Sequence, residues 1–398
     1  MLRFVAALTA LVCLAACKGD DIPSSATWPD GTHVVSGTGP LAYVTNNGSD
    51  TLSIVSLHDL SIVATVPVGL DIAEPEAPHH LAADPAHGYV YVGISNVKGA
   101  GPHSGIHGDH GGGDADSYVQ RLHIEDLSPA GATRVDPNLG DIVLFGGTRL
   151  VTTHFDLKRA TEAATMGLPP EEGWASLTLV DGTTMEKTGE VALCTAPHGV
   201  AVTSDGRLAL AACYGDDRVA FVDVSGDVPQ VLTRATLGPL ANDVPPPHYG
   251  PYSVLLFPDE SAAFVGNTDT RDLRVMDVAT MTVRDPGVVP LSGAAFFGAF
   301  SPDGATFYVP TQVADTLSVV DVATLSVTQT IPMDPAACVS PHVAMLDPQG
   351  TRILLVCEGD HLLPGSLVVF ERSTLDIVDV LPLGVYPDGI QIVNEVTW

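Results

Sequence analysis

The chain has 398 residues, of which 17 are Lys or Arg and 47 are Asp or Glu, so its net charge is −30. Apolar residues make up 45% of it, which excludes a disordered chain, and so few basic side chains exclude a nucleic-acid-binding protein, because Lys and Arg neutralise phosphates. The length is compatible with two or three domains or with one large all-β unit.

The N-terminus is predicted to direct export. Arg3 precedes an apolar run from Phe4 to Ala16, which is shorter than the ~20 residues of a membrane-spanning helix. We therefore expect a signal peptide over residues 1–16, a tether over residues 17–33 and no transmembrane helix. Leu14-Ala15-Ala16-Cys17 resembles the bacterial lipobox. The resemblance implies that Cys17 is lipidated and anchors the mature protein in the cell envelope, on the periplasmic face of the outer membrane or on the cell surface. The alternative is an ordinary signal peptide with an incidental cysteine.

An internal repeat predicts the fold of residues 34–398. Leu41 to Gly69 contains three short alternating apolar runs separated by turn residues, and Asp315 to Pro332 nearly repeats it. Repeats of roughly 40–50 residues with four strands each are typical of β-propeller blades. We predict an all-β, seven-bladed propeller in which residues 386–393 complete the first blade. The expected blades cover residues 41–67, 78–135, 139–193, 197–236, 251–291, 295–332 and 341–382.

The tetrapeptide Tyr43-Val44-Thr45-Asn46 opens such a repeat and resembles the YVTN family of β-propellers. The repeat-like units span nearly the whole chain after the tether. The resemblance implies the fold and leaves the function open, because this family serves many functions. A propeller whose channel is ringed by histidines also resembles the copper-bearing domain of nitrous oxide reductase in architecture, but no motif of that enzyme's activity is present.

Histidines recur at the predicted start of the innermost strand, strand A. Pro78-His79, Pro197-His198 and Pro341-His342 align there, and Pro387-Asp388, Pro251-Tyr252 and Ala295-Phe296 fill the same place in other blades. In propeller topology these starts surround one end of the central channel. We therefore predict a metal site at the channel mouth, formed by His79, His198, His342 and Asp388. The alternatives are turn histidines that bond to a neighbouring blade and an acid–base role without a metal.

The loops on the same face add further candidate ligands. Residues 97–116 form an expanded, glycine-rich loop with His103, His107 and His110, together with Asp109, Asp114 and Asp116, and His248 lies in another loop. A second expanded loop over residues 154–173 begins with His154 and Asp156, and a third contains Glu358, Asp360 and His361. Imidazoles with a few carboxylates favour copper or zinc. Calcium is a weaker candidate, because the aspartates lack EF-hand spacing, and a disordered linker is the alternative for the glycine-rich loop.

Four cysteines remain after Cys13 and Cys17. Cys194 precedes Cys213 by as many residues as Cys338 precedes Cys357, and Pro-His follows the first cysteine at the same distance in both pairs. In an exported protein this pattern predicts the disulfides Cys194–Cys213 and Cys338–Cys357. The alternative is a soft-metal site built from Cys and His.

Three functions remain open. The first is an envelope-anchored metal-binding propeller. The second is a scaffold that docks another envelope protein through its acidic face. The third is a lactonase-type hydrolase, for which His198, His342, Asp388 and Arg271 could serve; no nucleophile elbow, zinc-protease motif, P-loop or dinucleotide fingerprint is present, so no nucleotide cofactor is expected.

Overall fold

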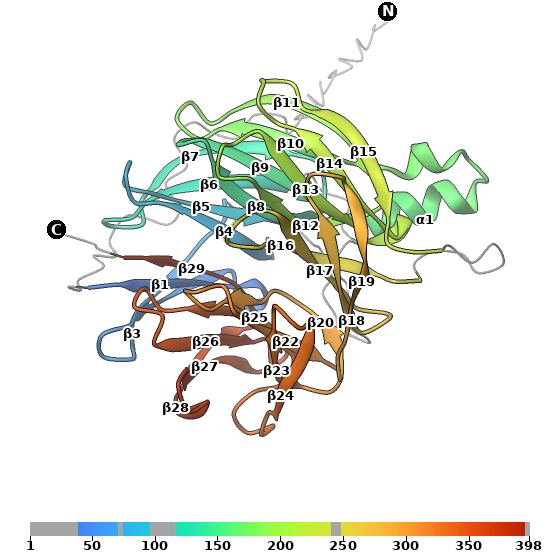
Figure 1. The fold of residues 1–398 in the computed structure, drawn as a ribbon. Coiled ribbons are helices and arrows are strands. Elements are labelled where there is room, and N and C mark those ends of the chain that lie inside the picture. The colour runs from blue at the N-terminus through green and yellow to red at the C-terminus, as the bar shows by residue number, and fades with distance from the viewer. Residues whose placement is uncertain (1–38, 71–74, 96–111, 113–116, 240–247, 395–398) are drawn as a thin grey trace, which may run out of the picture.

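The computed structural model describes residues 39–70, 75–95, 112, 117–239 and 248–394. These residues form seven antiparallel sheets that are arranged as the blades of a β-propeller (Figure 1). The predicted fold class is thereby confirmed. Each blade has four strands, A to D from the channel outward, except that strand A of blade six is split into two short pieces.

The innermost strands surround the channel. From blade one to blade seven, strand A is β29 (Pro387–Val393), β4 (Pro78–Asp84), β8 (Leu139–Phe145), β12 (Pro197–Val202), β16 (Pro251–Leu256), the pair β20 (Ala294–Ala295) and β21 (Ala299–Phe300), and β25 (Pro341–Leu346). Strand B is β1 (Leu41–Asn46), β5 (Tyr89–Ile94), β9 (Arg149–His154), β13 (Leu208–Cys213), β17 (Ala262–Asn267), β22 (Thr306–Gln312) and β26 (Arg352–Cys357).

The outer half of each blade follows the same order. Strand C is β2 (Thr51–Ser56), β6 (Ser117–His123), β10 (Ala175–Asp181), β14 (Arg218–Asp223), β18 (Asp272–Asp277), β23 (Thr316–Asp321) and β27 (Pro364–Glu371). Strand D is β3 (Ser61–Pro67), β7 (Pro129–Val135), β11 (Glu186–Cys194), β15 (Gln230–Thr236), β19 (Thr282–Pro290), β24 (Ser326–Pro332) and β28 (Asp376–Val385). The helical elements are α1 (Leu157–Thr165), η1 (Asn47–Ser49), η2 (Pro170–Gly173) and η3 (Tyr214–Asp216).

The C-terminal strand completes the first blade, as predicted. β29 pairs with β1 in antiparallel register, with Leu41 opposite Val393, and it also contacts β4 and β25 of the two adjacent blades. Strand A of each blade thus borders strand A of the next around the channel, so His342, Asp388 and His79 come from consecutive blades.

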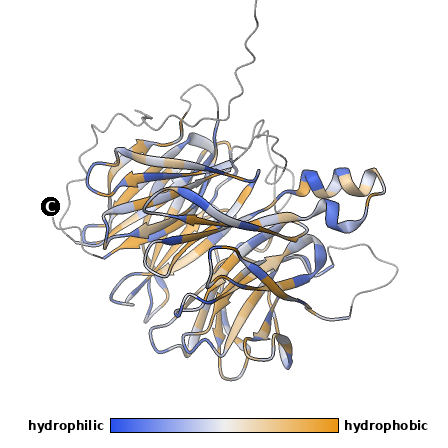
Figure 2. Ribbon diagram, turned by 90° about the horizontal axis from the view of Figure 1, so that it is seen from above, coloured by the Kyte–Doolittle hydropathy of each residue, from blue (hydrophilic) through white to orange (hydrophobic). Residues whose placement is uncertain are grey.

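Burial follows the position of a strand within its blade. Strand B of blade one, LAYVTN, is buried at every residue because adjacent blades cover both of its faces. Strand D of the same blade, SIVATVP, is mostly exposed. The inner strands therefore read as continuous apolar runs, and the outer ones as mixed runs. Figure 2 shows the apolar residues gathered inside the blades and the polar ones at the turns.

The YVTN-like tetrapeptide lies in strand B of blade one. The Thr45 hydroxyl donates to the carbonyl oxygen of His79 and accepts from the Gly389 N–H at 2.8 Å, so it ties two blades together. The Asn46 side chain donates to Ser53 at 2.9 Å and accepts from the Gly384 N–H at 3.0 Å. Thr45 thus connects β1 to strand A of blades one and two, and Asn46 connects it to the segment that leads into β29.

Two regions differ from the expectation. The segment expected as an expanded loop over residues 154–173 contains the helix α1, whose first N–H groups are capped by Asp156. Strand A of blade six is interrupted at residues 296–298, and there the Phe297 N–H donates to the carbonyl of His342 in blade seven at 3.1 Å. Among the described residues, no helix combines the length and apolar character needed to cross a membrane.

Candidate functional site

The same backbone conformation at the start of strand A places the predicted residues in the channel. The residue before the strand-A proline has a left-handed conformation in five blades: Ala77 (φ 54°), Ala196 (φ 48°), Gly250 (φ 64°), Ser340 (φ 52°) and Tyr386 (φ 52°). The proline that follows disfavours the right-handed helical conformation at this preceding residue. The chain therefore enters these five blades in the same way, and the residue after the proline is His79, His198, Tyr252, His342 or Asp388.

These four predicted residues do come together. His79 Nδ1 donates to Asp388 Oδ2, and His79 Nε2 lies 3.2 Å from His198 Nε2. His342 Nδ1 lies 3.3 Å from Asp388 Oδ1. Each of the four is at most 1% exposed. The four side chains of the cluster are therefore enclosed by the surrounding blades at this end of the channel.

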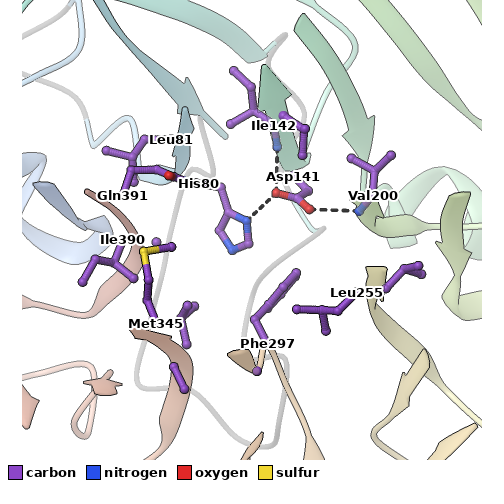
Figure 3. A pocket seen from close by; sticks show the side chains of 16 residues that line it. His80, Leu81, Asp141, Ile142, Val200, Leu255, Phe297, Met345, Ile390 and Gln391 are labelled. Atoms are coloured by element: carbon purple, nitrogen blue, oxygen red, sulfur yellow. Dashed lines mark hydrogen bonds and ion pairs between the residues drawn. The ribbon is translucent and has the colours of Figure 1, made fainter. Parts of the chain in front are cut away.

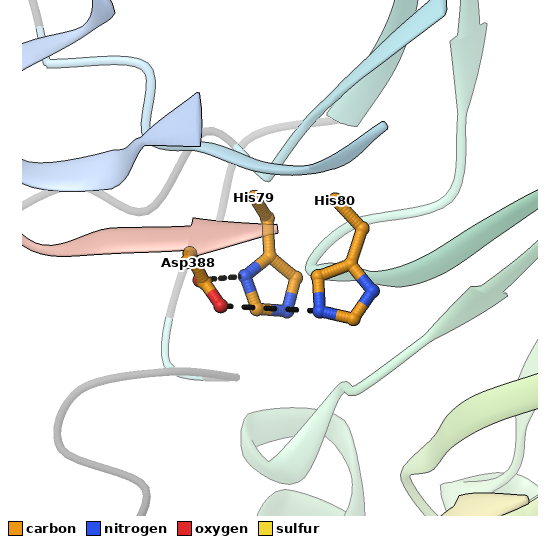
Figure 4. A group of neighbouring side chains, drawn as sticks. All are labelled: His79, His80 and Asp388. Carbon is orange, nitrogen blue, oxygen red and sulfur yellow. Dashed lines mark hydrogen bonds and ion pairs between the residues drawn. The ribbon is translucent and has the colours of Figure 1, made fainter. Parts of the chain in front are cut away.

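Two further members were missed by the sequence analysis. The His80 ring stacks on His79, with centroids 4.4 Å apart, and His80 Nε2 lies 3.8 Å from Asp388 Oδ1 (Figure 4). Asp141 of β8 accepts from His80 Nδ1 at 2.7 Å and from the N–H groups of Ile142 and Val200 at 2.8 and 2.9 Å. The His-His doublet was a readable signal for His80, whereas blade three lacks the strand-A proline that would have marked Asp141.

Glu358 supports the cluster from blade seven. Its carboxylate accepts from His342 Nδ1, from Gln312 Nε2 at 2.7 Å and from His361 Nε2 at 2.6 Å. The His361 ring in turn stacks on Tyr386, with centroids 3.7 Å apart. Glu358 and His361 were predicted to share a loop on this face, and in the structure Glu358 contacts His342 directly while His361 contacts Glu358.

Three histidines therefore share one arrangement, in which Nδ1 is held by a carboxylate: His79 by Asp388, His80 by Asp141 and His342 by Glu358. Because an ionised carboxylate can only accept, Nδ1 carries the hydrogen, and in a neutral ring Nε2 carries a lone pair. Within the described residues, the Nε2 atoms of His80 and His342 and the Oδ1 atom of Asp388 have no hydrogen-bond partner. Metal-binding histidines are oriented by carboxylates in this way.

The environment separates the pKa values of two of the histidines. Burial lowers the pKa of His79 well below 6.5, and the nearby rings of His80 and His342 lower it further. Burial also acts to lower the pKa of His342, but the carboxylates of Asp388 and Glu358 outweigh it and raise that pKa. Burial would raise the pKa of Glu358, but His342 and His361 hold it below its usual value. His79 is thus neutral, while His342 is protonated more readily.

Aromatic side chains close the other side of the cluster. Tyr252 stacks on His198 with ring centroids 3.7 Å apart, and Phe155 meets the same imidazole edge-on at 5.2 Å. Phe296 meets His342 edge-on at 4.9 Å. Burial, together with the charge of Asp388, raises the pKa of Tyr252 well above 10, so its hydroxyl stays neutral. The imidazoles of His198 and His342 therefore contact aromatic rings on this side.

Both predicted disulfides are present, between Cys194 and Cys213 and between Cys338 and Cys357. The four cysteines are consequently not metal ligands, and the alternative of a soft-metal Cys-His site is excluded. Each disulfide joins the segment before strand A to the end of strand B. Cys194 of the first disulfide lies shortly before His198 in the chain, and Cys357 of the second directly precedes Glu358.

The remaining predicted residues lie elsewhere or outside the described residues. His248 is exposed, with its ring against Tyr249, and Arg271 is exposed in a turn, so neither joins the buried cluster. His154 is buried beside Thr152, and burial lowers its pKa to about 4. Asp360 is exposed. Cys17, His103, His107, His110, Asp109, Asp114 and Asp116 lie outside the described residues.

The geometry of the cluster fits a transition-metal ion. His79, His80 and Asp388 each offer one ligand atom, and these three atoms lie within 4.8 Å of one another. Two nitrogen ligands of one tetrahedral ion with metal–nitrogen bonds of 2.0–2.1 Å are about 3.3 Å apart, close to the 3.2 Å between the Nε2 atoms of His79 and His198. The donor set of imidazoles with one carboxylate suits zinc and copper.

Solved structures share the fold at low sequence identity. A functionally unknown protein from Desulfotomaculum acetoxidans is 15% identical with a TM-score of 0.65, over 89% of this chain and 99% of that one. A periplasmic gluconolactonase from Pseudomonas aeruginosa is 14% identical with a TM-score of 0.64, over 90% and 99%. A putative 6-phosphogluconolactonase from Bacteroides fragilis is 14% identical with a TM-score of 0.62, over 89% and 98%. No family model and no curated protein matches the chain in sequence. These likenesses support the fold alone.

Proposed function

We propose that this protein is a metal-binding β-propeller that holds one copper or zinc ion among the buried side chains of its central channel. His79, His80, His198 and Asp388 are the proposed ligands. His342 is not a proposed ligand; it lies beside Asp388 and would carry a positive charge there when protonated. The glycine-rich loop with His103, His107 and His110 is proposed to collect the ion and pass it inward.

A pair of facing acceptors carries the proposal. Asp141 holds Nδ1 of His80, and His80 Nε2 faces Asp388 Oδ1 at 3.8 Å, while neither of these two buried atoms has a hydrogen-bond partner among the described residues. Two buried acceptors in this position repel each other unless a proton or a cation lies between them. Metal–nitrogen and metal–oxygen bonds of about 2.0–2.2 Å allow one ion to bridge this distance.

The charges around the cluster favour the same conclusion. Asp141, Glu358 and Asp388 are buried carboxylates, and within the described part of the chain their ion pairs are with histidines alone. Buried charges are normally paired or coordinate a metal. A divalent cation would balance the carboxylates without requiring several buried histidines to be protonated.

Metal binding can be measured on the full mature protein after treatment with a chelator. We expect one copper or zinc ion per chain by mass spectrometry, with a rise in melting temperature, because a ligand that binds only the folded state stabilises it. Replacing His80 by Gln and Asp388 by Asn removes two proposed ligands and should weaken metal binding at least tenfold. A tenfold change corresponds to about 1.4 kcal/mol of binding free energy. His58→Gln, at an exposed histidine, is the matched control and should bind normally.

A second series distinguishes the channel from the loop. Replacing His103, His107 and His110 by Ser should slow metal uptake and leave the final content at one ion per chain. If this triple variant loses the metal and the His80/Asp388 variant keeps it, the channel is not the site. A wild-type protein that takes up neither metal contradicts the proposal as a whole.

A lactonase-type hydrolase is the second candidate. The names of two similar structures support it, as does the presence of a neutral His79 beside a more basic His342, which is a pairing suited to acid–base chemistry. Arg271, the arginine named with His198, His342 and Asp388 for this activity, is exposed and lies outside the cluster, so it cannot act together with them. Hydrolysis of gluconolactone by the metal-free protein, abolished in His342→Gln, would favour this candidate over metal binding.

The location of the protein is proposed from the lipobox-like segment. We place it in the cell envelope, attached to the membrane through Cys17, where it could also dock another envelope protein. Cys17→Ala should move the protein from the membrane fraction to the soluble fraction. Retention of a bound partner by the His80/Asp388 variant would favour the scaffold function.

A further inference from the structure

The channel has a second half with a different chemistry. A cavity of about 180 Å³ extends from His80 and Asp141 along the later residues of the innermost strands (Figure 3). Its wall is mostly apolar and comes from all seven blades, and it includes Val143, Val200, Leu255, Phe297, Met345 and Ile390. The cavity and the proposed metal site therefore meet at His80.

Exposure along the strands shows which end of the cavity meets solvent. In blades four, five and seven the first four residues of strand A are buried, and the fifth is partly exposed. Met345 and Leu255 are such fifth residues, and both line the cavity. The cavity thus becomes more open away from the histidines, on the side where strands A and B are joined.

The cavity offers no free charge to a ligand. Gln391 is neutral, and Asp141 is the one carboxylate among the residues that line the cavity. Both Asp141 oxygens are occupied, Oδ1 by His80 Nδ1 and the Ile142 N–H and Oδ2 by the Val200 N–H. A charged molecule would lose its hydration here without a compensating partner, whereas a neutral molecule would bury its apolar surface favourably.

We infer that this apolar half-channel binds a small neutral molecule with one nitrogen or sulfur donor, which reaches the metal from the side of His80. The inference rests on the proposed metal site. The volume limits the ligand to one small ring or a short chain, since an apolar cavity of about 150 Å³ accommodates benzene. Pyridine and short thioethers have the required size, neutrality and donor atom.

The ligand series on the copper-loaded wild-type protein is the first test. Copper content is measured beforehand, so that failure of the metal site is recognised separately. Pyridine should shift the visible absorption of the bound copper with a saturable dependence on concentration. Quinoline, which is too large, and azide, which is charged, should bind at least tenfold more weakly.

Variants of the cavity wall provide the second test. Met345→Phe narrows the cavity and should weaken pyridine binding at least tenfold, while Met345→Ala should admit quinoline. Leu346→Phe is the matched control, because Leu346 follows in the same strand, is partly buried in the same way and does not line the cavity. Val143→Phe on blade three repeats the narrowing should Met345→Phe not fold.

The outcomes separate the two proposals. Stoichiometric copper whose spectrum does not respond to pyridine overturns the inference and leaves the metal site standing. Equal binding of pyridine, quinoline and azide, or binding that is indifferent to Met345→Phe and Val143→Phe, also overturns it, because the ligand then arrives by another route. Absence of copper from the wild-type protein overturns both.

Discussion

The two sides of the ring carry opposite chemistry at the same backbone position. Blades seven, one, two and four place His342, Asp388, His79 and His198 at the start of strand A, whereas blades five and six place Tyr252 and Phe296 there. All six side chains are buried. The backbone enters strand A in the same conformation in these blades, blade six excepted, and the residue at this one position determines whether a blade places a polar or an aromatic side chain in the channel.

The polar side can be buried because it carries its own partners. Each carboxylate of the cluster bonds to at least one imidazole, and Asp141 and Glu358 accept additional hydrogen bonds from neighbouring blades. On the aromatic side, Tyr252 and Phe296 contact imidazoles through their rings. A buried polar group without partners costs free energy, and this cost distinguishes the two sides experimentally.

The largest expected effect is from removing the central carboxylate. Asp388→Ala leaves the His79 Nδ1–H without its acceptor and takes a negative charge away from His342. Breaking a buried ion pair costs about 3–5 kcal/mol, and we expect a loss of this size in the free energy of unfolding in urea. Asp376→Ala, at an exposed aspartate of β28, should change it by under about 0.5 kcal/mol. A similar small change in both variants would contradict the central role of Asp388.

The disulfides lie on the polar side: Cys194 at the end of β11 in blade three bonds to Cys213 of blade four, and Cys338 bonds to Cys357 of blade seven. Replacing Cys338 and Cys357 together by Ser opens a loop with a sequence separation of 19. The free energy of unfolding should fall by about 3 kcal/mol. Metal affinity should also decrease, because Cys357 directly precedes Glu358, which orients His342. Unchanged metal affinity in the folded double variant would show that this disulfide is independent of the cluster.

Sequence reasoning could find the members of the cluster that share the repeat. His79, His198, His342 and Asp388 all follow a strand-A proline, so aligning the blades was enough to bring them to one end of the channel. The cysteine pairs could be found for the same reason, from their equal spacing. These features depend on local sequence and on the closed geometry of the fold.

The remaining members depend on contacts between blades. Asp141 is recruited by His80 across a blade boundary, and no proline or histidine marks its position. Glu358 was recognised as a loop carboxylate, but its bond to His342 follows from the side-chain packing of blade seven. Phe297 reaches the channel because strand A of blade six is interrupted. The burial of the cluster also depends on the packing of the whole ring, which the repeat pattern alone does not describe.

Exchanging residues between the two sides should give a smaller, asymmetric effect. Phe296→His places an imidazole between the rings of Tyr252 and His342 at a buried position and should cost about 2 kcal/mol. His198→Phe puts an aromatic ring beside Tyr252 and Phe155 and should cost under about 1.5 kcal/mol, while weakening metal binding. Both are measured by urea denaturation. If His198→Phe lowers the free energy of unfolding more than Phe296→His does, the contact between His79 and His198 contributes substantially to stability.

The smallest effect is a pH dependence with two opposite slopes. His79 has its pKa lowered in the folded protein, so below pH 6.5 the unfolded chain binds more protons, and the stability of the metal-free protein should fall as pH falls. His342 has its pKa raised, so above pH 6.5 the folded protein binds more protons, and stability should decline as pH rises through the folded-state pKa. The free energy of unfolding of the wild-type protein should therefore peak near the ordinary histidine pKa. His342→Gln should remove the decline on the alkaline side and leave the acid side intact, whereas a decline that persists in this variant would assign it to another group.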